Sequence, residues 1–550
     1  MEMIRTWAER NRSLLGLAAV FALALLLRCP IASIPLERDE GEYAYIAQRW
    51  LQGEVPYKET FDQKPPGIFA LYALFISCIG TSAAAIHWGM QIYTLGTLVL
   101  VYWLGKRLFS ETAGLTAAAL CAFMTSAPCF FGHSANTEMA MILPLTAGLA
   151  ATLRAVESAS ARWSLLAGVC AAAALLCKQV ALFPVALYPL LIVTGARAGR
   201  WRMLGAMVLG GVAPLAVVVG YFVWHDAWHD FYDCVIGHNL SYAGRIPLVL
   251  YPFLLLNPLF GLITISGPIY WLAGGAAIGG WRIRPSSSPG PHYPGPVALL
   301  VLWLILSLLS VVVGGRFFEH YFVTTIPATA LLAGIRIDTL MRRGSDGRLE
   351  NLRAHGLAAL VIGYGIAVGW WYYLPGALEE KSRKLYSTNI FVSTVRVGQF
   401  LAEDSRPDDT IFVLGCEPEV FYYADRKSAS RYIYAYPLVG STADARRRQQ
   451  AVLQELTDKP PNYVVIIFNP QHLLYQGDLH ESQTDWCDGI LELIRRSYEV
   501  AMVQPIEKSE PANLTGKAAA EMWDEHPTSY KAGAGKYCIV VYRRLCPKLP

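Results

Sequence analysis

The sequence predicts an α-helical polytopic membrane protein with a C-terminal soluble α/β domain, and three observations support this fold class. Of the 550 residues, 54% are hydrophobic and only 16% are charged, which is more apolar surface than a soluble fold of this size hides. The apolar residues gather into runs long enough to cross a hydrocarbon layer, which takes about 20 helical residues. After about residue 379 the chain changes to mixed charge and ordinary polarity.

About eleven membrane crossings are expected. Four apolar runs contain no charged residue at all: 203–224, 247–281, 296–315 and 356–378. The full set of expected spans is 13–34, 88–105, 112–131, 139–153, 163–177, 179–194, 203–224, 250–273, 297–314, 321–336 and 356–374. An odd number of crossings places the two termini on opposite sides of the membrane.

Short loops rich in Lys and Arg set the expected orientation, because such loops stay in the cytoplasm. The N-terminus is then cytoplasmic, and the C-terminal domain lies outside an inner or plasma membrane. The expected domains are a transmembrane domain, 1–375, whose first outward loop covers about 35–87, and an outward-facing domain, 376–550. Chemistry on the outer side has no access to ATP or nucleotide sugars, which limits its energy source.

The C-terminal region shows a strand, helix, strand pattern. Short β-branched runs occupy 409–415 and 462–468, and the apolar residues of 444–457 between them fall at helical spacing. This order predicts a small α/β domain with a partly parallel sheet.

The first loop carries an unusual group of charges for a mostly apolar chain. The stretch "ERDEGEYAYIAQRW" (37–50) repeats apolar residues at three- and four-residue steps, which predicts an amphipathic helix lying along the membrane surface. Glu42, Tyr45 and Arg49 are expected to point away from its apolar face. Such a helix would hold its first residues, Glu37, Arg38, Asp39 and Glu40, at the depth of a lipid phosphate.

A second cluster follows in "FDQKPPG" (61–67). The paired prolines stop a preceding helix and hold Lys64 in an extended conformation, which makes it a fixed cation at the membrane surface. The apolar run 68–79 that follows is too short for a confident span and is expected in the interface or as a re-entrant segment. The alternative interpretation is that Lys64 snorkels and Asp39 caps a helix.

These residues carry a resemblance to a known family. An acidic element after the first span, an amphipathic helix, an aspartate and "K-P-P" resemble the membrane glycosyltransferases of the GT-C fold. Within them the chain is most similar to glycosyltransferase family 39, which includes protein O-mannosyltransferases and lipid A aminoarabinose transferases. The stretches 132–144, "GHSANTEMAMILP", and 316–334, "RFFEHYFVTTIPATALLAG", look like two further segments of bacterial members.

The resemblance implies an inverting transfer of a sugar from a polyprenyl-phosphate carrier to a hydroxyl of a cell-envelope acceptor, which is a lipid, a polysaccharide or a protein. The leaving phosphate is stable as an anion and needs no general acid. One carboxylate base then suffices, whereas a glycosidase needs two carboxyl groups. Asp39 matches the family's catalytic acid, and Lys64 matches its phosphate-facing position.

The remaining candidate site residues have less specific roles. Arg38 and Arg316 are expected to help bind the donor phosphate. The residues expected to position sugar or acceptor are Glu37, Glu40, Asp62, Glu138, His320 and Tyr321. For Glu138 the alternative is a helix cap, and for His320 and Tyr321 it is an interfacial aromatic belt.

No metal site is assigned and no cofactor is certain, although a divalent metal is possible. His225, His229 and His238 share one loop with three aspartates, but a wet polar loop explains them equally. The expected partners are the polyprenyl-phosphate donor, the hydroxyl acceptor and membrane lipid, and no nucleic acid.

Two other functions compete with the transferase. A transporter or lipid flippase usually carries ionisable residues in the middle of spans and internal repeats. Here Arg28 and Lys178 are the main charges within apolar runs, and no repeat is visible. A membrane-anchored sensor that binds a ligand through its tail would leave the first-loop pattern unexplained.

Overall fold

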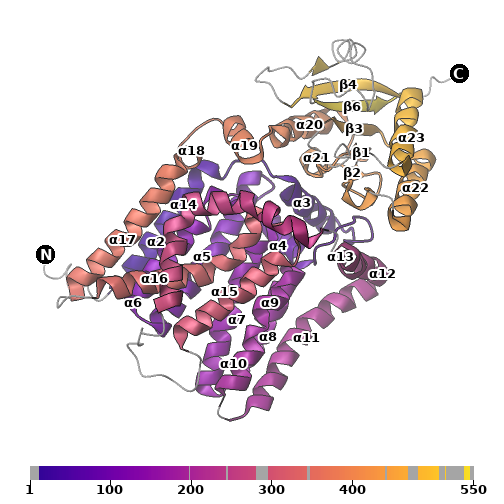
Figure 1. Ribbon diagram of the computed structural model, residues 1–550. Coiled ribbons are helices and arrows are strands. Elements are labelled where there is room, and N and C mark those ends of the chain that lie inside the picture. Colours follow the sequence, from indigo (N-terminus) through magenta and orange to yellow (C-terminus); the bar gives the residue numbers. More distant parts are fainter. Residues whose placement is uncertain are drawn as a thin grey trace. The chain divides into compact units, whose positions relative to one another are not determined.

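The computed structural model describes residues 11–196, 198–242, 246–279, 295–342, 347–439, 442–468, 481–506, 514–515 and 538–545. The chain divides into two compact units, each described here by itself (Figure 1). The helical unit comprises Met1–Ser33, Gln63–Leu71 and Ser77–Gly376, and the second unit comprises Ile34–Asp62, Tyr72–Ile76 and Ala377–Pro550. The first half of the first loop therefore groups with the C-terminal region. Nothing in the sequence indicated this grouping.

The described part of the helical unit contains seven helices that are long and apolar enough to cross a membrane. They are α2 (Arg12–Arg28), α5 (Ala83–Leu108), α7 (Thr137–Ser158), α11 (Arg200–Trp224), α14 (Tyr251–Gly279), α16 (Ile326–Met341) and α17 (Gly347–Val368). Shorter apolar helices accompany them: α4 (Gly67–Cys78), α6 (Glu111–Met124), α8 (Ala161–Cys177), α9 (Leu182–Val185), α10 (Leu187–Gly195) and α15 (Pro296–Val312).

The predicted α-helical polytopic membrane fold is confirmed. Each of the eleven expected spans is helical over most of its length, seven as long helices and the other four as shorter ones. The run 179–194 is interrupted because a 3₁₀ turn, Gln179–Ala181, leads into α9 before α10 begins. Helices α11 and α14 leave most of their apolar surface uncovered by protein, as lipid-facing helices do.

Short elements connect these helices and carry polar side chains. The π-helical turn η4 (Asp233–Gly237) lies between α12 (Trp228–Tyr232) and α13 (His238–Tyr242). The 3₁₀ segment η7 (Glu319–Thr325) precedes α16, and the short helix α18 (Trp370–Tyr373) follows α17.

Among the described residues of the C-terminal region, six strands form one sheet with the order β2-β1-β3-β6-β4-β5. Its strands are β1 (Thr410–Leu414), β2 (Lys427–Ser428), β3 (Tyr463–Phe468), β4 (Tyr498–Pro505), β5 (Leu514–Thr515) and β6 (Cys538–Arg544). Strands β1 and β3 pair in parallel, with Val413 opposite Val465, and α22 (Ala443–Asp458) connects them along the chain. The predicted α/β domain with a partly parallel sheet is confirmed. The antiparallel strand β6 between β3 and β4 was not predicted.

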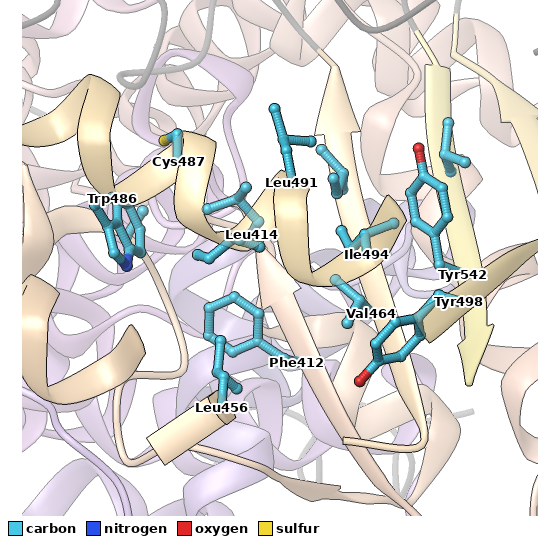
Figure 2. Packing of buried hydrophobic residues seen from close by; sticks show 14 of the residues in the cluster. Phe412, Leu414, Leu456, Val464, Trp486, Cys487, Leu491, Ile494, Tyr498 and Tyr542 are labelled. Carbon is cyan, nitrogen blue, oxygen red and sulfur yellow. The ribbon is translucent and has the colours of Figure 1, made fainter. Parts of the chain in front are cut away.

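Both faces of this sheet are buried. Phe412, Leu414 and Val464 point toward α23 (Glu481–Ser497), whose Leu491 and Ile494 meet them (Figure 2). The alternate strand residues point to the other face, and α20 (Ile390–Asp404) packs against β4 and β6. Burial on both faces explains why these strands read as continuous apolar runs instead of an alternating pattern.

The amphipathic helix of the first loop is present as α3 (Arg38–Leu51). Its polar face, however, is not open to water. Tyr45 is 1% exposed and Arg49 is 8% exposed, because this face lies against α21 (Glu419–Ala424) of the C-terminal region. The sequence could not show this partner, which begins almost four hundred residues further along the chain. Helix α19 (Leu378–Tyr386) completes the second unit.

Candidate active site

The predicted site residues fall into two groups, one in each compact unit. The second unit holds Glu37, Arg38, Asp39, Glu40 and Asp62, and the helical unit holds Lys64, Glu138, Arg316, His320 and Tyr321. The first group is mainly acidic, and the second combines cations with aromatic rings.

The first turn of α3 is organised by a capping box. Glu37 is the N-cap residue, and its carboxylate accepts a hydrogen bond from the Asp39 backbone N–H at 3.2 Å. In return the Glu40 carboxylate accepts one from the Glu37 N–H at 3.2 Å. The box satisfies backbone donors that a helix start otherwise leaves without partners. The capping residue is therefore Glu37, and the alternative interpretation that Asp39 caps the helix is wrong.

The carboxylate of Asp39 is left for other contacts. Its Oδ2 atom lies 3.5 Å from the hydroxyl of Tyr43, one helical turn further on. Tyr43 is fully buried and meets the ring of Tyr72 edge to face, with 5.6 Å between ring centroids. Two features therefore position Asp39: the capping box at the start of α3 and the buried ring of Tyr43.

Burial and neighbouring charges raise the proton affinity of Glu37. Burial raises the pKa of Glu37 well above its usual value, and the neighbouring charges of Asp39 and Glu40 raise it further. Like charges at close range disfavour ionisation of a carboxyl group, which is why Asp39 and Glu40 act on Glu37 in this direction.

Arg38 has a structural partner. Its Nε atom donates to the carbonyl oxygen of Cys416 at 2.6 Å, and its guanidinium lies 3.2 Å from a carboxylate oxygen of Glu417. The side chain of Glu417 is fully buried, so the pair is a fixed one. Arg38 is thus paired within its own unit, and its role in binding the donor phosphate stays a prediction. Asp62, the last residue of the first-loop segment Ile34–Asp62 in this unit, is also fully buried.

In the helical unit, the segment that carries Lys64 is clamped by two amides. The carbonyl oxygen of Gln63 accepts hydrogen bonds from Gln179 at 3.1 Å and from Asn239 at 2.8 Å. The same two amides also donate to the carbonyl oxygen of Val235, at 3.2 and 2.9 Å. Two of these bonds tie Gln63 to the 3₁₀ turn that begins at Gln179 and to α13. The other two tie the same amides to Val235 in η4.

The other side of Lys64 is equally constrained. Pro65 and Pro66 are buried, and α4 begins at Gly67. A Cβ atom at Gly67 would lie 2.5 Å from the carbonyl oxygen of Leu176, so the backbone at this point touches the last turn of α8. The backbone around Lys64 is held between the amide clamp and this contact, and the role of its ammonium as a fixed cation stays a prediction.

A second lysine lies next to the clamp. Lys178 follows α8 directly in an extended conformation and forms an ion pair with Glu138, in the first turn of α7. The Glu138 carboxylate also accepts a hydrogen bond from the Thr137 hydroxyl at 2.9 Å. The Lys178 ammonium lies over the ring of Tyr321, 4.1 Å from its centroid, and the ring centroid of His320 is 4.8 Å from that of Tyr321. Three predicted residues, Glu138, His320 and Tyr321, are thus brought together by one that was not predicted.

The sequence did contain a signal for Lys178. A lysine that ends an apolar helix and is followed at once by a break is placed where an intramembrane charge usually serves a site. The signals for Gln179 and Asn239 are weaker, since nothing in their local sequence shows that they bind Gln63. Arg316 lies in the loop between α15 and η7, four residues before His320.

The other charge within an apolar run has a packing role. Arg28 is 2% exposed, and its guanidinium donates to the carbonyl oxygens of Thr125 at 2.8 Å and His133 at 3.4 Å. His133 in turn hydrogen bonds through Nδ1 to the Tyr372 hydroxyl at 3.1 Å. These contacts join α2 to the segment between α6 and α7.

The side chains that could bind a metal ion are the next feature of the site. In the part of the chain that the structure describes, no three His, Cys, Asp or Glu side chains are grouped so that they could hold a metal ion. The ring of His225 lies against Tyr221, with 4.5 Å between the centroids.

Known proteins resemble this chain in sequence and in fold. Residues 63–224 match the family model described as dolichyl-phosphate-mannose-protein mannosyltransferase. No curated protein matches the sequence.

Solved structures share the fold over nearly the whole chain. The structure of ArnT from Cupriavidus metallidurans bound to undecaprenyl phosphate has a TM-score of 0.58 at 14% identity and covers 96% of this chain and 97% of its own. The apo oligosaccharyltransferase of Archaeoglobus fulgidus has a TM-score of 0.52 at 13% identity and covers 94% and 76%. Identities this low establish a common fold and no more. The protein is an integral membrane protein with the GT-C-like fold of these structures, and over residues 63–224 its sequence is similar to that mannosyltransferase family, in line with the resemblance that the sequence indicated.

Proposed function

We propose that the protein is an inverting glycosyltransferase that moves a sugar from a polyprenyl-phosphate carrier to a hydroxyl of a cell-envelope acceptor. The observation that carries this proposal is the segment of Lys64, held rigid by Gln179, Asn239 and the close approach of Gly67 to Leu176. A cation fixed in advance stabilises a phosphate without the cost of reorganisation during the reaction. The likeness to a fold that in ArnT binds undecaprenyl phosphate supports the same class of donor.

Asp39 is the proposed catalytic base. It takes the proton of the acceptor hydroxyl as the oxygen attacks the anomeric carbon, and the bond from that carbon to the carrier phosphate breaks. The polyprenyl phosphate leaves as an anion, so no acid is needed on its side. A single displacement inverts the anomeric centre. Glu37 and Glu40 support the base by holding the first turn of α3 through the capping box.

The donor phosphate is assigned to Lys64, with Lys178 as a second cation. The negative charge of Glu138 balances Lys178 before the donor binds, and Tyr321 covers the ammonium. His320 and Tyr321 then offer ring faces and a hydroxyl for the sugar or the lipid headgroup. The transfer takes place on the outer side of the membrane, where the lipid-borne sugar is the energy source.

The test is transfer in liposomes. Purified protein is reconstituted with a panel of polyprenyl-phosphate sugars and a cell-envelope extract, and donor consumption is compared between wild type and Asp39→Asn. We expect consumption of one donor that falls at least a hundredfold in the variant, as typical for loss of a general base. The matched control is Glu59→Gln, in the same loop, whose carboxylate accepts a hydrogen bond from the Val55 N–H at 2.9 Å and is outside the proposed machinery.

Two results would contradict the proposal. Undiminished transfer by a correctly folded Asp39→Asn variant would show that Asp39 is not the catalytic base. Movement of lipid-linked sugar across the bilayer without any covalent change would favour the transporter alternative instead.

A further inference from the structure

One face of α3 is docked on the segment that joins β1 to β2. Residues of this face recur every three or four positions: Arg38, Gly41, Tyr45 and Arg49. Each contacts the range 416–428. Arg38 binds Cys416 and Glu417, the Tyr45 hydroxyl accepts a hydrogen bond from the Ser428 N–H at 2.8 Å, and Arg49 pairs with Asp425 at 2.9 Å.

The middle of this face is a backbone contact. A Cβ atom at Gly41 would lie 2.3 Å from the Cβ of Glu419, so only glycine lets α3 approach α21 this closely. The dock therefore combines close packing at its centre with one ion pair at each end. Both halves belong to the same compact unit.

We propose that Glu417 is a positioning residue for the base Asp39, acting through Arg38. The inference rests on the proposed function, in which Asp39 takes the acceptor proton. It assigns to the C-terminal domain a direct part in the reaction, because this domain supplies Glu417 and with it the placement of the catalytic helix.

The placement of Arg38 supports a specific role for the pair. Arg38 is the first residue of α3, and a cation at a helix N-terminus is disfavoured by the helix dipole. Glu417 is fully buried, with one carboxylate oxygen accepting the Cys416 N–H at 2.6 Å and the other facing Arg38. A buried carboxylate requires a charged partner, which Arg38 provides. In turn, the pairing with Glu417 offsets the unfavourable position of Arg38 at the helix start.

The pair benefits Asp39 in two ways. Successive residues of a helix are turned by roughly 100°, so Asp39 points away from the docked face while the dock fixes the rotation of the helix. In addition, a cation beside a carboxylate lowers its affinity for a proton. Because Glu417 offsets the charge of Arg38, this effect of the neighbouring cation on Asp39 is reduced.

The test uses the full-length protein with Glu417→Gln, which keeps the shape of the side chain and an oxygen for the Cys416 N–H. The matched control is Asp425→Asn, which breaks the ion pair at the other end of the same dock, where the Asp425 side chain is 57% exposed. Amide hydrogen exchange is measured at 41–43, together with kcat, the KM for the donor and the pH profile of kcat.

In Glu417→Gln we expect exchange about fivefold faster at these amides, since a partly exposed ion pair contributes modestly. We also expect kcat to fall about tenfold at an unchanged donor KM, and the acidic limb of the pH profile to move about half a pH unit lower, because an uncompensated Arg38 favours ionised Asp39. A merely structural role would not move that limb. Asp425→Asn should leave the exchange at 41–43 and the pH profile as in wild type.

Exchange and kcat equal to wild type in Glu417→Gln would overturn the inference, as would identical changes in Asp425→Asn. A failure of the proposed function would look different. Full activity of Asp39→Asn would show that Asp39 is not the base, and the catalytic part of the inference would fall with it. The hydrogen-exchange measurement would still decide whether Glu417 holds α3.

Discussion

The carbonyl oxygen of Gln63 accepts a hydrogen bond from the side chain of Gln179 at 3.1 Å. Each of these residues is the chain neighbour of a lysine, Lys64 on one side and Lys178 on the other. One bond therefore links the segments that carry the two proposed phosphate-binding cations. Any change that lengthens this bond should alter the spacing of the two charges and the fit of the donor.

The first prediction concerns this bond directly. Gln179→Met keeps the volume of the side chain but removes the amide, and we expect the KM for the donor to rise about fivefold with little change in kcat. A single hydrogen bond contributes about 1 kcal/mol, and about 1.4 kcal/mol corresponds to a factor of ten in binding. The measurement is the dependence of transfer on donor concentration in liposomes.

The control for this prediction is Gln91→Met. Gln91 is 1% exposed on α5, and among the described residues neither its amide nitrogen nor its amide oxygen has a hydrogen-bond partner. Loss of this amide should leave the donor KM unchanged. An unchanged KM in Gln179→Met, or an equal rise in Gln91→Met, would show that the clamp does not set the position of Lys64.

The second prediction concerns the ion pair of Glu138 and Lys178. Their side chains are 2% and 13% exposed, so removal of one partner leaves a charge with little access to water. Glu138→Gln should destabilise the protein by about 3 kcal/mol, as expected when one member of a buried pair is removed. Thermal unfolding in detergent measures this loss.

The double variant Glu138→Leu/Lys178→Met separates stability from function. Replacement of both charges by apolar side chains is often neutral, so its Tm should return close to that of wild type. Transfer should nevertheless stay at least tenfold below wild type, because the second cation is missing. Full transfer by a stable double variant would make the pair a packing feature only.

The parts of this protein that sequence patterns could predict are those that depend on local composition. Apolar run length predicted the spans, short β-branched runs predicted β1 and β3, and helical spacing predicted α22. The helix α3 was also expected, since its apolar residues repeat along one face. The fixed conformation around Lys64 followed from the two prolines.

The parts that sequence patterns missed depend on contacts between distant segments. From the sequence alone the polar face of α3 is expected to face water. Tyr45 and Arg49 are buried because this face lies against α21 and the residues that follow it, up to Ser428. From the sequence alone Lys178 is a charge at the end of a span, and its ion pair with Glu138 is visible only in the structure. Strand β6 was missed because its neighbours in the sheet are set by pairing across the chain and not by its own seven residues.

The third prediction is a pH dependence of stability that comes from Glu419. Burial first, and then the nearby charge of Glu417, raise the pKa of Glu419 from its usual value of 4.5 to about 8. The folded state holds this proton more strongly than the unfolded chain does. The contribution to stability is therefore fully present below pH 4.5 and is lost as the pH rises through about 8.

Glu419→Gln should remove this dependence, so the free energy of unfolding of the variant, relative to wild type, should rise between pH 5 and about pH 8. Denaturant unfolding of both proteins across this range gives the comparison. Glu492→Gln serves as the control, because the Glu492 side chain is 58% exposed and pairs with Arg496 on the surface of α23. Parallel pH curves for wild type and Glu419→Gln would contradict the assignment.

The fourth prediction uses the glycine of the K-P-P-G segment. In Gly67→Ala the new methyl group would lie 2.5 Å from the carbonyl oxygen of Leu176, and because this neighbour is backbone it cannot turn aside. Overpacking of this kind costs about 1–3 kcal/mol, so Tm should fall. The prolines transmit the displacement to Lys64, so the donor KM should rise as well. Gly363→Ala on α17 is the control, since a Cβ there meets no atom within 4 Å and alanine favours a helix. Normal Tm and KM in Gly67→Ala would mean that the segment is free to move, and a fixed cation would no longer explain donor binding.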